Sequence, residues 1–256
     1  MDVSTTFPTK PDTGWLTVFR PVDRPRLRLF CLPFAGAGAS AYRDWGRHLP
    51  EDVELCAVQL PGRENRINER VPGHIGELVP PLLAALRPRL DIPFALFGHS
   101  LGAAIAYEVA RGLIAIGRPP RVLGVSGRRA PHAPLDRPPL HRLSDSDLKR
   151  EIAQMGGTPP EVLSHEELMD FLLPTLRADL RLSETYHRDA DTRVACPMLA
   201  FAGTDDPEAP PKTVEAWGAV SGGTFTHTIL DGDHFFVKNH TRRILDAILE
   251  NIAIEN

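Results

Sequence analysis

The sequence predicts an α/β protein with a mostly parallel central sheet, flanking helices and a helical lid insertion. Short apolar runs of strand character alternate with helical patterns, which is typical of parallel sheets covered by helices on both faces. One segment, at about residues 128–193, interrupts this alternation. The 256 residues and 42% hydrophobic content suffice for a large core, so we expect one domain spanning residues 1–256.

The expected strands are short apolar runs bounded by polar or turn-forming residues. They are Leu27–Leu32, Val53–Leu60, Phe94–Phe97, Val122–Val125, Met198–Ala202 and Phe225–Leu230. Trp15–Phe19 precedes them and is expected to form an antiparallel edge strand. Helical patterns cover Ala41–His48, Ile75–Leu90, Leu101–Ile116, Thr213–Val220 and Thr241–Ile252. In such sheets the chemistry collects at the carboxyl ends of the strands.

The segment 128–193 has no convincing strand, so we expect a lid, with an ordinary helical layer as the alternative. Two capping-box patterns predict helix starts. These patterns are Ser144-x-x-Asp147 and Ser164-x-x-Glu167. The apolar positions of the second helix are Leu168, Phe171, Leu172 and Leu176, which share one side. Pro174 is expected to kink or divide that helix.

Composition excludes several classes of protein. The net charge of −4 gives no sign of nucleic-acid binding, and the ten histidines do not cluster with cysteines as metal ligands would. The polar N-terminus lacks a signal-peptide core, and no apolar stretch reaches the ~18 residues of a membrane helix. Three widely spaced cysteines fit buried, reduced side chains. We expect a cytoplasmic monomer without metal or cofactor.

A G-x-S-x-G pattern surrounds Ser100, between the apolar run Phe94–Phe97 and a long helical pattern. This context predicts a strand-to-helix elbow with Ser100 as a nucleophile. Gly98 and Gly102 would allow strand and helix to approach closely. A serine hydroxyl needs a base, an orienting acid and an oxyanion site before it attacks a carbonyl carbon. A glycine-rich turn with a capping serine is the alternative.

His234 is the candidate base, because its loop follows the last expected strand. His227 within that strand and His240 near the last helix are weaker candidates. The elbow should turn the side chain of His99 away from the site. The orienting acid should follow the preceding strand, where Asp205 and Asp206 compete. We favour Asp206, since the following proline biases it towards an extended conformation.

The oxyanion site needs two backbone N–H groups. One would come from Leu101, at the start of the helix after the serine, where the helix dipole favours negative charge. The second would come from the glycine-rich loop after Leu27–Leu32, with Ala35 as the candidate and Phe34 as the alternative. This loop contains G-x-G but lacks the third glycine of a dinucleotide fingerprint, so cofactor binding is not expected.

Several segments together resemble the stand-alone type II thioesterases of polyketide and nonribosomal peptide synthases, which have the α/β-hydrolase fold. These segments are residues 32–38 (LPFAGAG), 59–64 (QLPGRE) with Arg66, 97–102 (FGHSLG), 203–207 and 232–235 (GDHF). Generic esterases share only the serine elbow, so QLPGRE is the discriminating segment. The resemblance implies a Ser100–Asp206–His234 triad, with oxyanion amides at Ala35 and Leu101.

The resemblance also implies a substrate: an acyl group in thioester linkage to the phosphopantetheine arm of a carrier protein. Hydrolysis would clear aberrant or stalled acyl chains. The alternatives are a small-molecule carboxylesterase, a product-releasing thioesterase and a non-catalytic interaction protein. Four arginines are interpreted as solvated surface residues, with contacts to the phosphate or to an acidic carrier surface as the alternative. They are Arg63, Arg66, Arg128 and Arg129.

Overall fold

A seven-stranded sheet forms the centre of the computed structural model, which describes residues 14–253. The strands follow the order β1-β3-β2-β4-β5-β6-β7; β1 is antiparallel to β3, and the other neighbours are parallel. Their bounds are β1 Leu16–Arg20, β2 Leu27–Leu32, β3 Val53–Val58, β4 Phe94–His99, β5 Leu123–Ser126, β6 Met198–Gly203 and β7 Phe225–Leu230. The predicted α/β class and antiparallel edge strand are confirmed. The polar N-terminal segment, residues 1–13, lies outside the described residues.

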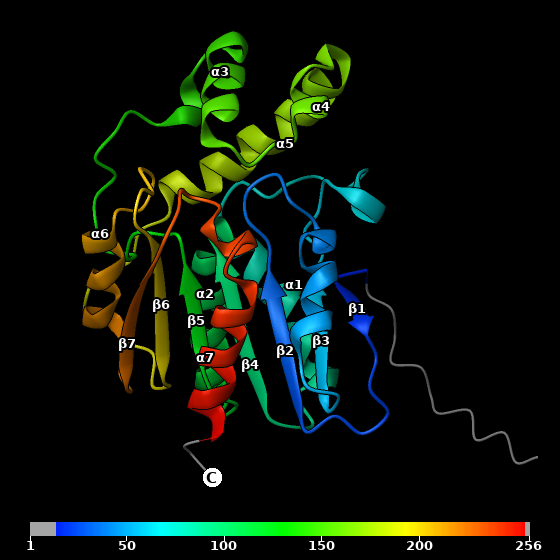
Figure 1. The fold of residues 1–256 in the computed structure, drawn as a ribbon, viewed down its shortest axis with the longest axis vertical. Helices are drawn as coiled ribbons and strands as arrows, with labels where there is room; N and C mark the ends of the chain where they lie inside the picture. Colours follow the sequence, from blue (N-terminus) through cyan, green and yellow to red (C-terminus); the bar gives the residue numbers. More distant parts are fainter. Residues whose placement is uncertain (1–13, 254–256) are drawn as a thin grey trace, which may run out of the picture.

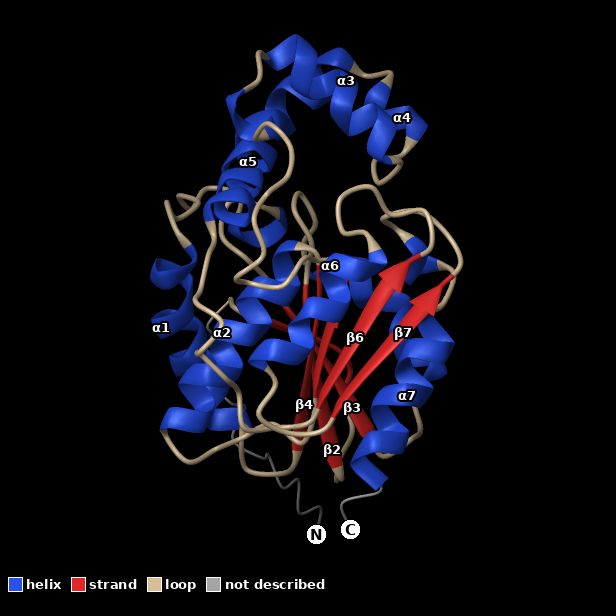
Figure 2. Cartoon of the chain, turned by 90° about the vertical axis from the view of Figure 1, so that its left-hand side faces the viewer, coloured by secondary structure: helices blue, strands red, loops and turns tan. Residues whose placement is uncertain are grey.

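Helices cover both faces of the sheet (Figure 1 and Figure 2). Their bounds are α1 Ile75–Leu86, α2 Leu101–Ala115, α3 Asp145–Met155, α4 Pro160–Leu163, α5 Glu166–Thr185, α6 Pro211–Glu215 and α7 Thr241–Ala253. Apolar side chains of α1 and α2 pack on one face, and those of α7 pack on the other. The central strands β2, β3 and β4 are buried along their whole length, which agrees with their largely apolar sequences.

Two expected α-helices are wholly or partly 3₁₀-helical. Residues Ala39–His48 form a 3₁₀ helix that buries Tyr42 and Trp45 against the sheet. The expected helix Thr213–Val220 is divided between α6 and a 3₁₀ turn at Ala216–Val220. Each segment contains a glycine, Gly46 or Gly218, which lowers helical propensity, and each buries a tryptophan, Trp45 or Trp217.

Between β5 and β6 the chain forms α3, α4 and α5, and the fully described segment 128–193 contains no strand. These helices lie over the carboxyl ends of the strands (Figure 1). They have a small apolar cluster of their own, formed by Leu140, Leu148, Ile152, Met169, Leu173 and Leu180. The expected start of α3 is correct, because Ser144 Oγ accepts a hydrogen bond from the amide of Asp147 at 3.2 Å.

Two expectations for α5, its start and its buried face, are wrong. Its N-cap is His165, whose Nδ1 accepts from the amide of Leu168 at 3.3 Å, so the helix starts at Glu166, one residue later than expected. Phe171 is 62% exposed, while the neighbouring Leu173 is buried. The contacts of α5 with the rest of the insertion therefore bury a different face. Pro174 lies on the exposed side within the helix and does not divide it, and a kink at this position stays a prediction.

Candidate active site

The carboxyl ends of β4, β6 and β7 bring together Ser100, Asp206 and His234. His234 Nε2 lies 3.1 Å from Ser100 Oγ, so it can accept the hydroxyl proton. On the other side of the ring, Nδ1 donates to both carboxylate oxygens of Asp206 at 3.0 and 2.9 Å. The arrangement joins a hydroxyl, an imidazole and a carboxylate in one chain of hydrogen bonds, as nucleophilic catalysis by serine requires.

Ser100 stands on a strained turn between β4 and α2. Its φ of 53° and ψ of −117° are rare for a residue with a side chain. A Cβ on Gly98 would lie 2.1 Å from the carbonyl oxygen of Gly102. A Cβ on Gly102 would lie 2.1 Å from the carbonyl oxygen of Leu32. Both glycines are therefore required for the close approach of strand and helix that exposes Ser100 at the sheet edge.

Of the two competing aspartates, Asp206 contacts the imidazole of His234, whereas Asp205 is exposed and accepts from Thr204. The Asp206 carboxylate is buried and also accepts from the amides of Glu208 and Ala209 at 2.9 and 3.1 Å. Burial by itself would raise the pKa of Asp206. The hydrogen bonds from His234 and these two amides outweigh burial, so the pKa is lowered and the group stays ionised.

The other histidines lie away from this chain of hydrogen bonds. His99 is buried, with Nδ1 3.0 Å from Ser126 Oγ and its ring centre 5.1 Å from that of His234. Burial and the nearby His234 lower the pKa of His99 to about 3, so its ring is neutral. His227 lies within β7, and His240 Nε2 contacts the carbonyl oxygen of Asp231 at 2.8 Å. Within residues 14–253, none of these three histidine side chains forms a hydrogen bond with the Ser100 side chain.

The loop after β2 lies beside Ser100 in the lining of the same cavity. The amide of Ala37 donates to the carbonyl oxygen of Phe34 at 3.1 Å, and that of Gly36 donates to Asp179 at 2.8 Å. Within residues 14–253, the amide of Ala35 has no acceptor and is available for an oxyanion. Leu101 is the first residue of α2, so its amide also lacks an acceptor within the helix.

A cavity of about 450 Å³ opens at Ser100 and His234 and extends under the insertion. Much of its lining is apolar and comes from α3 to α5, including Ile152, Met155, Val162, Met169, Leu172, Leu176 and Leu180. A cavity of this kind can accommodate an acyl chain whose carbonyl carbon reaches Ser100. Among residues 14–253, no group of His, Cys, Asp or Glu could hold a metal ion, and no helix could cross a membrane.

The interpretation of the arginines as solvated is wrong for three of the four, because Arg63, Arg66 and Arg128 are only 4–7% exposed. Arg63 pairs with Asp179 of α5. Arg66 pairs with Glu69 and donates to the carbonyl oxygen of Gln59. Arg128 donates to the hydroxyl and carbonyl oxygens of Ser183. Arg129 is half-buried, with only long contacts to two carbonyl oxygens.

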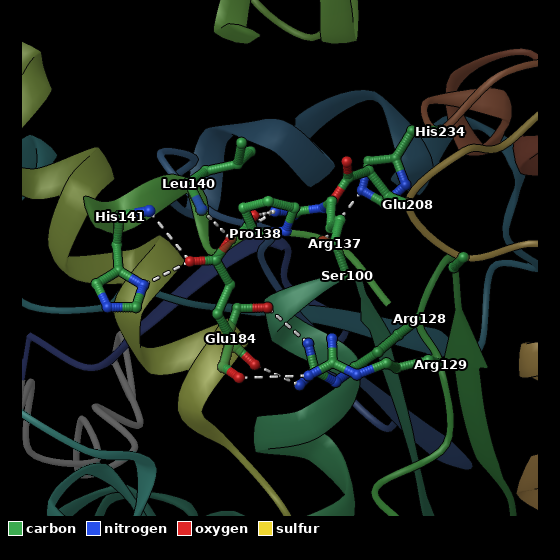
Figure 3. A network of polar contacts seen from close by, with 12 residues as sticks. Ser100, Arg128, Arg129, Arg137, Pro138, Leu140, His141, Glu184, Glu208 and His234 are labelled. Atoms are coloured by element: carbon green, nitrogen blue, oxygen red, sulfur yellow. Dashed lines mark hydrogen bonds and ion pairs between the residues drawn. The ribbon is translucent and has the colours of Figure 1, made fainter. Parts of the chain in front are cut away.

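A network of charged side chains at the cavity wall could not be recognised from the sequence. Arg137 contacts Glu184 of α5 at 2.8 Å and also pairs with Glu208, two residues after Asp206. Figure 3 shows these side chains between the insertion and His234. Glu184 also accepts from the His141 ring and from the amides of Leu140 and His141. The network ties the insertion to the loop that holds the orienting acid.

Comparisons with known proteins agree with this geometry. A family model for the thioesterase domain matches residues 27–253. The gramicidin S biosynthesis protein GrsT of Aneurinibacillus migulanus is 36% identical, with 90% of each chain covered. The thioesterase PikA5 of Streptomyces venezuelae is also 36% identical, covering 96% of this chain and 89% of that protein.

Solved structures extend the match to the fold. The type II thioesterase BorB from the borrelidin biosynthetic cluster superposes with a TM-score of 0.87 at 36% identity, covering 95% of this chain and all of that one. These findings confirm the resemblance inferred from the PFAGAG, QLPGRE and serine-elbow segments. This chain belongs to the thioesterase domain family, as a thioester hydrolase of the α/β-hydrolase fold.

Proposed function

We propose that this thioesterase hydrolyses acyl thioesters on the phosphopantetheine arms of carrier proteins, clearing aberrant or stalled chains in polyketide or nonribosomal peptide biosynthesis. The hydrogen-bonded chain Ser100–His234–Asp206, at the mouth of an apolar cavity, carries the proposal. Relatives named for gramicidin S biosynthesis and the borrelidin cluster support the pathway. The cytoplasmic location and monomeric state expected from the sequence stay predictions.

In the proposed mechanism, His234 takes the hydroxyl proton while Ser100 Oγ attacks the thioester carbon. The amides of Ala35 and Leu101 stabilise the oxyanion that forms. The tetrahedral intermediate collapses, and His234 returns the proton to the departing phosphopantetheine thiol. A water molecule then attacks the acyl-enzyme, with His234 as its base, and releases the carboxylic acid. Asp206 holds the imidazole tautomer and stabilises the imidazolium in both halves.

The insertion, as a lid, would shape the acyl chamber and gate access of the carrier. The apolar side chains that α3 to α5 contribute to the cavity support this role. A gating lid opens locally at a lower free energy than the sheet. Amide hydrogen exchange should therefore be faster in residues 145–185 than in β2, β3 and β4. Equal protection in both regions would contradict a gating role.

Hydrolysis of a panel of acyl-loaded carrier proteins tests the proposed function. The wild-type enzyme should release acyl groups from the loaded carriers, and Ser100→Ala should lower kcat/KM by at least about 10⁴-fold. The same acyl groups offered as simple oxygen esters distinguish a carboxylesterase, which would prefer the esters. Negligible turnover of every loaded carrier by the wild-type enzyme would overturn the assignment.

A further inference from the structure

Helix α5 carries a buried carboxylate that directly contacts the loop after β2, which contains Ala35. Asp179 is fully buried, and its Oδ2 accepts a hydrogen bond from the amide of Gly36 at 2.8 Å. Its Oδ1 accepts from Arg63 Nη2 at 2.8 Å, and Arg63 Nη1 donates to Oδ2. One side chain of the lid thus contacts two loops at the carboxyl edge of the sheet.

The amide that Asp179 binds belongs to the central peptide group of a tight turn. Residues 34–37 are closed by the hydrogen bond from Ala37 N–H to the Phe34 carbonyl oxygen. Gly36 has a φ of +77°, as the third residue of a type II turn requires. If this peptide group flipped, the Ala35 carbonyl oxygen would replace the Gly36 N–H opposite Asp179. Repulsion between that oxygen and the carboxylate favours the observed orientation.

Arg63 connects the same carboxylate to the far end of the turn. Its Nη1 donates to the Ala37 carbonyl oxygen at 3.3 Å, and its Nε and Nη2 donate to the Pro61 carbonyl oxygen at 3.1 and 2.9 Å. The guanidinium therefore has partners on three sides and balances the buried charge of Asp179. A pair held by so many hydrogen bonds fixes the geometry of the turn that contains Ala35.

We propose that Asp179 is a positioning residue for hydrolysis, which holds the 34–37 turn so that the Ala35 amide stabilises the oxyanion. The inference rests on the proposed roles of Ser100 and Ala35. It adds that the position of α5 affects the geometry of the oxyanion site. Because Asp179 belongs to α5, displacement of this helix removes the acceptor of the Gly36 amide. The oxyanion site is then complete only when the lid helix lies over the sheet.

Two double variants separate positioning from a merely structural role. Arg63→Met with Asp179→Leu removes both charges and the acceptor of the Gly36 amide. Arg63→Gln with Asp179→Asn also removes both charges but keeps an oxygen that can accept from Gly36. Neither leaves one charge of the pair buried alone, which would be strongly destabilising. Asp170→Asn is the matched control on the same helix, since Asp170 pairs with Lys149 at 2.6 Å within the lid.

Two measurements report on the oxyanion site without a carrier protein. One is the kcat and KM for hydrolysis of p-nitrophenyl butyrate. The other is the inhibition constant of an alkyl trifluoromethyl ketone, which forms a tetrahedral adduct with a serine. The Met/Leu variant should lose about 10- to 100-fold in kcat and a similar factor in ketone affinity, with little change in KM. The Gln/Asn variant should regain most of both losses, and Asp170→Asn should match the wild-type enzyme.

Equal kcat values for the two double variants would overturn the inference, as would a loss confined to KM. If the Met/Leu chain does not fold, Arg63→Gln with Asp179→Leu removes the same acceptor, leaves no charge buried alone and keeps a hydrogen-bonding side chain at position 63. Its kcat should fall about 10- to 100-fold below that of the Gln/Asn variant, and equal kcat values for these two variants would contradict the inference. A wild-type enzyme that hydrolyses the ester but no loaded carrier refutes the proposed function and leaves this inference standing.

Discussion

The sheet with its flanking helices and the insertion above it are held in place by different forces. Large apolar clusters cover both faces of the sheet, with β2, β3 and β4 buried throughout. The insertion has a cluster of six buried apolar residues and is attached largely by directional contacts from charged side chains. Burial of apolar surface stabilises the sheet, and such burial tolerates exchanges between apolar side chains of similar volume. The charged contacts of the insertion determine its position over the sheet. Their partners Arg63 and Glu208 belong to loops that line the cavity.

The largest expected effect is on kcat, for a residue in the loop after strand β6. Asp206→Asn should lower kcat by about 10⁴-fold, because the amide would hold the wrong imidazole tautomer of His234. Kinetics on p-nitrophenyl butyrate would measure this loss. Asp205→Asn is the matched control, since the exposed Asp205 contacts Thr204 and not His234, and it should retain near wild-type kcat. A similar loss in both variants would contradict the assignment of the acid.

Gly98→Ala should lower the free energy of unfolding by about 3 kcal/mol or more, because the new Cβ would overlap backbone atoms that cannot move away. The nearest are Gly102 O at 2.1 Å and Ala103 N at 2.6 Å. Gly117→Ala has open space around its Cβ and should cost about 1 kcal/mol from its positive φ alone. Urea denaturation compares the two, and equal costs would show that the elbow is less tightly packed than the structure indicates.

Leu173→Ala should lower the free energy of unfolding by about 2 kcal/mol, whereas Phe171→Ala should change it by less than about 0.5 kcal/mol. The two residues lie on the same helix, but Leu173 belongs to the buried cluster of the insertion and Phe171 is exposed to solvent. Chemical denaturation of both variants tests which face of α5 is buried. A larger loss for Phe171→Ala would restore the face expected from the sequence.

The smallest expected effect is a change in pH dependence. Burial alone would raise the pKa of Glu184, but hydrogen bonds from His141, Leu140 and Arg137 outweigh it and lower the pKa. Its stabilising contribution is therefore complete above the ordinary glutamate value of about 4.3 and is lost as the pH falls through the lowered value. The stability difference between the wild type and Glu184→Gln should shrink over that acidic range. A constant difference from pH 7 to pH 3 would contradict this account.

The sequence predicts the sheet well because its strands are buried on both faces. Runs that are apolar at all but one position, such as LRLFCL and VELCAV, can be recognised without knowledge of their neighbours. The positions of Ser100, Asp206 and His234 follow from the same reasoning, since each lies just beyond a recognisable strand. The order of strands in a parallel sheet then brings their carboxyl ends together.

The attachment of the insertion could not be predicted in this way. Arg63 and Asp179 are 116 positions apart, and nothing local distinguishes a buried pair from two solvated charges. The same holds for Arg137 with Glu208, 71 positions apart. The buried face of α5 was misjudged because Leu168 and Phe171 fit the helical period as well as Met169 and Leu173 do. Tertiary contacts, which a periodic pattern does not contain, decide between those faces.

The 134 positions that separate Ser100 from His234 have a consequence for synthesis of the enzyme. A nascent chain emerges from its N-terminus and folds as it lengthens. Until the last strand, β7, joins the edge of the sheet beside β6, the elbow serine has no imidazole within reach. A chain that ends before His234 therefore carries a serine without its base. Only chains synthesised beyond His234 can expose the cell's thioesters to hydrolysis.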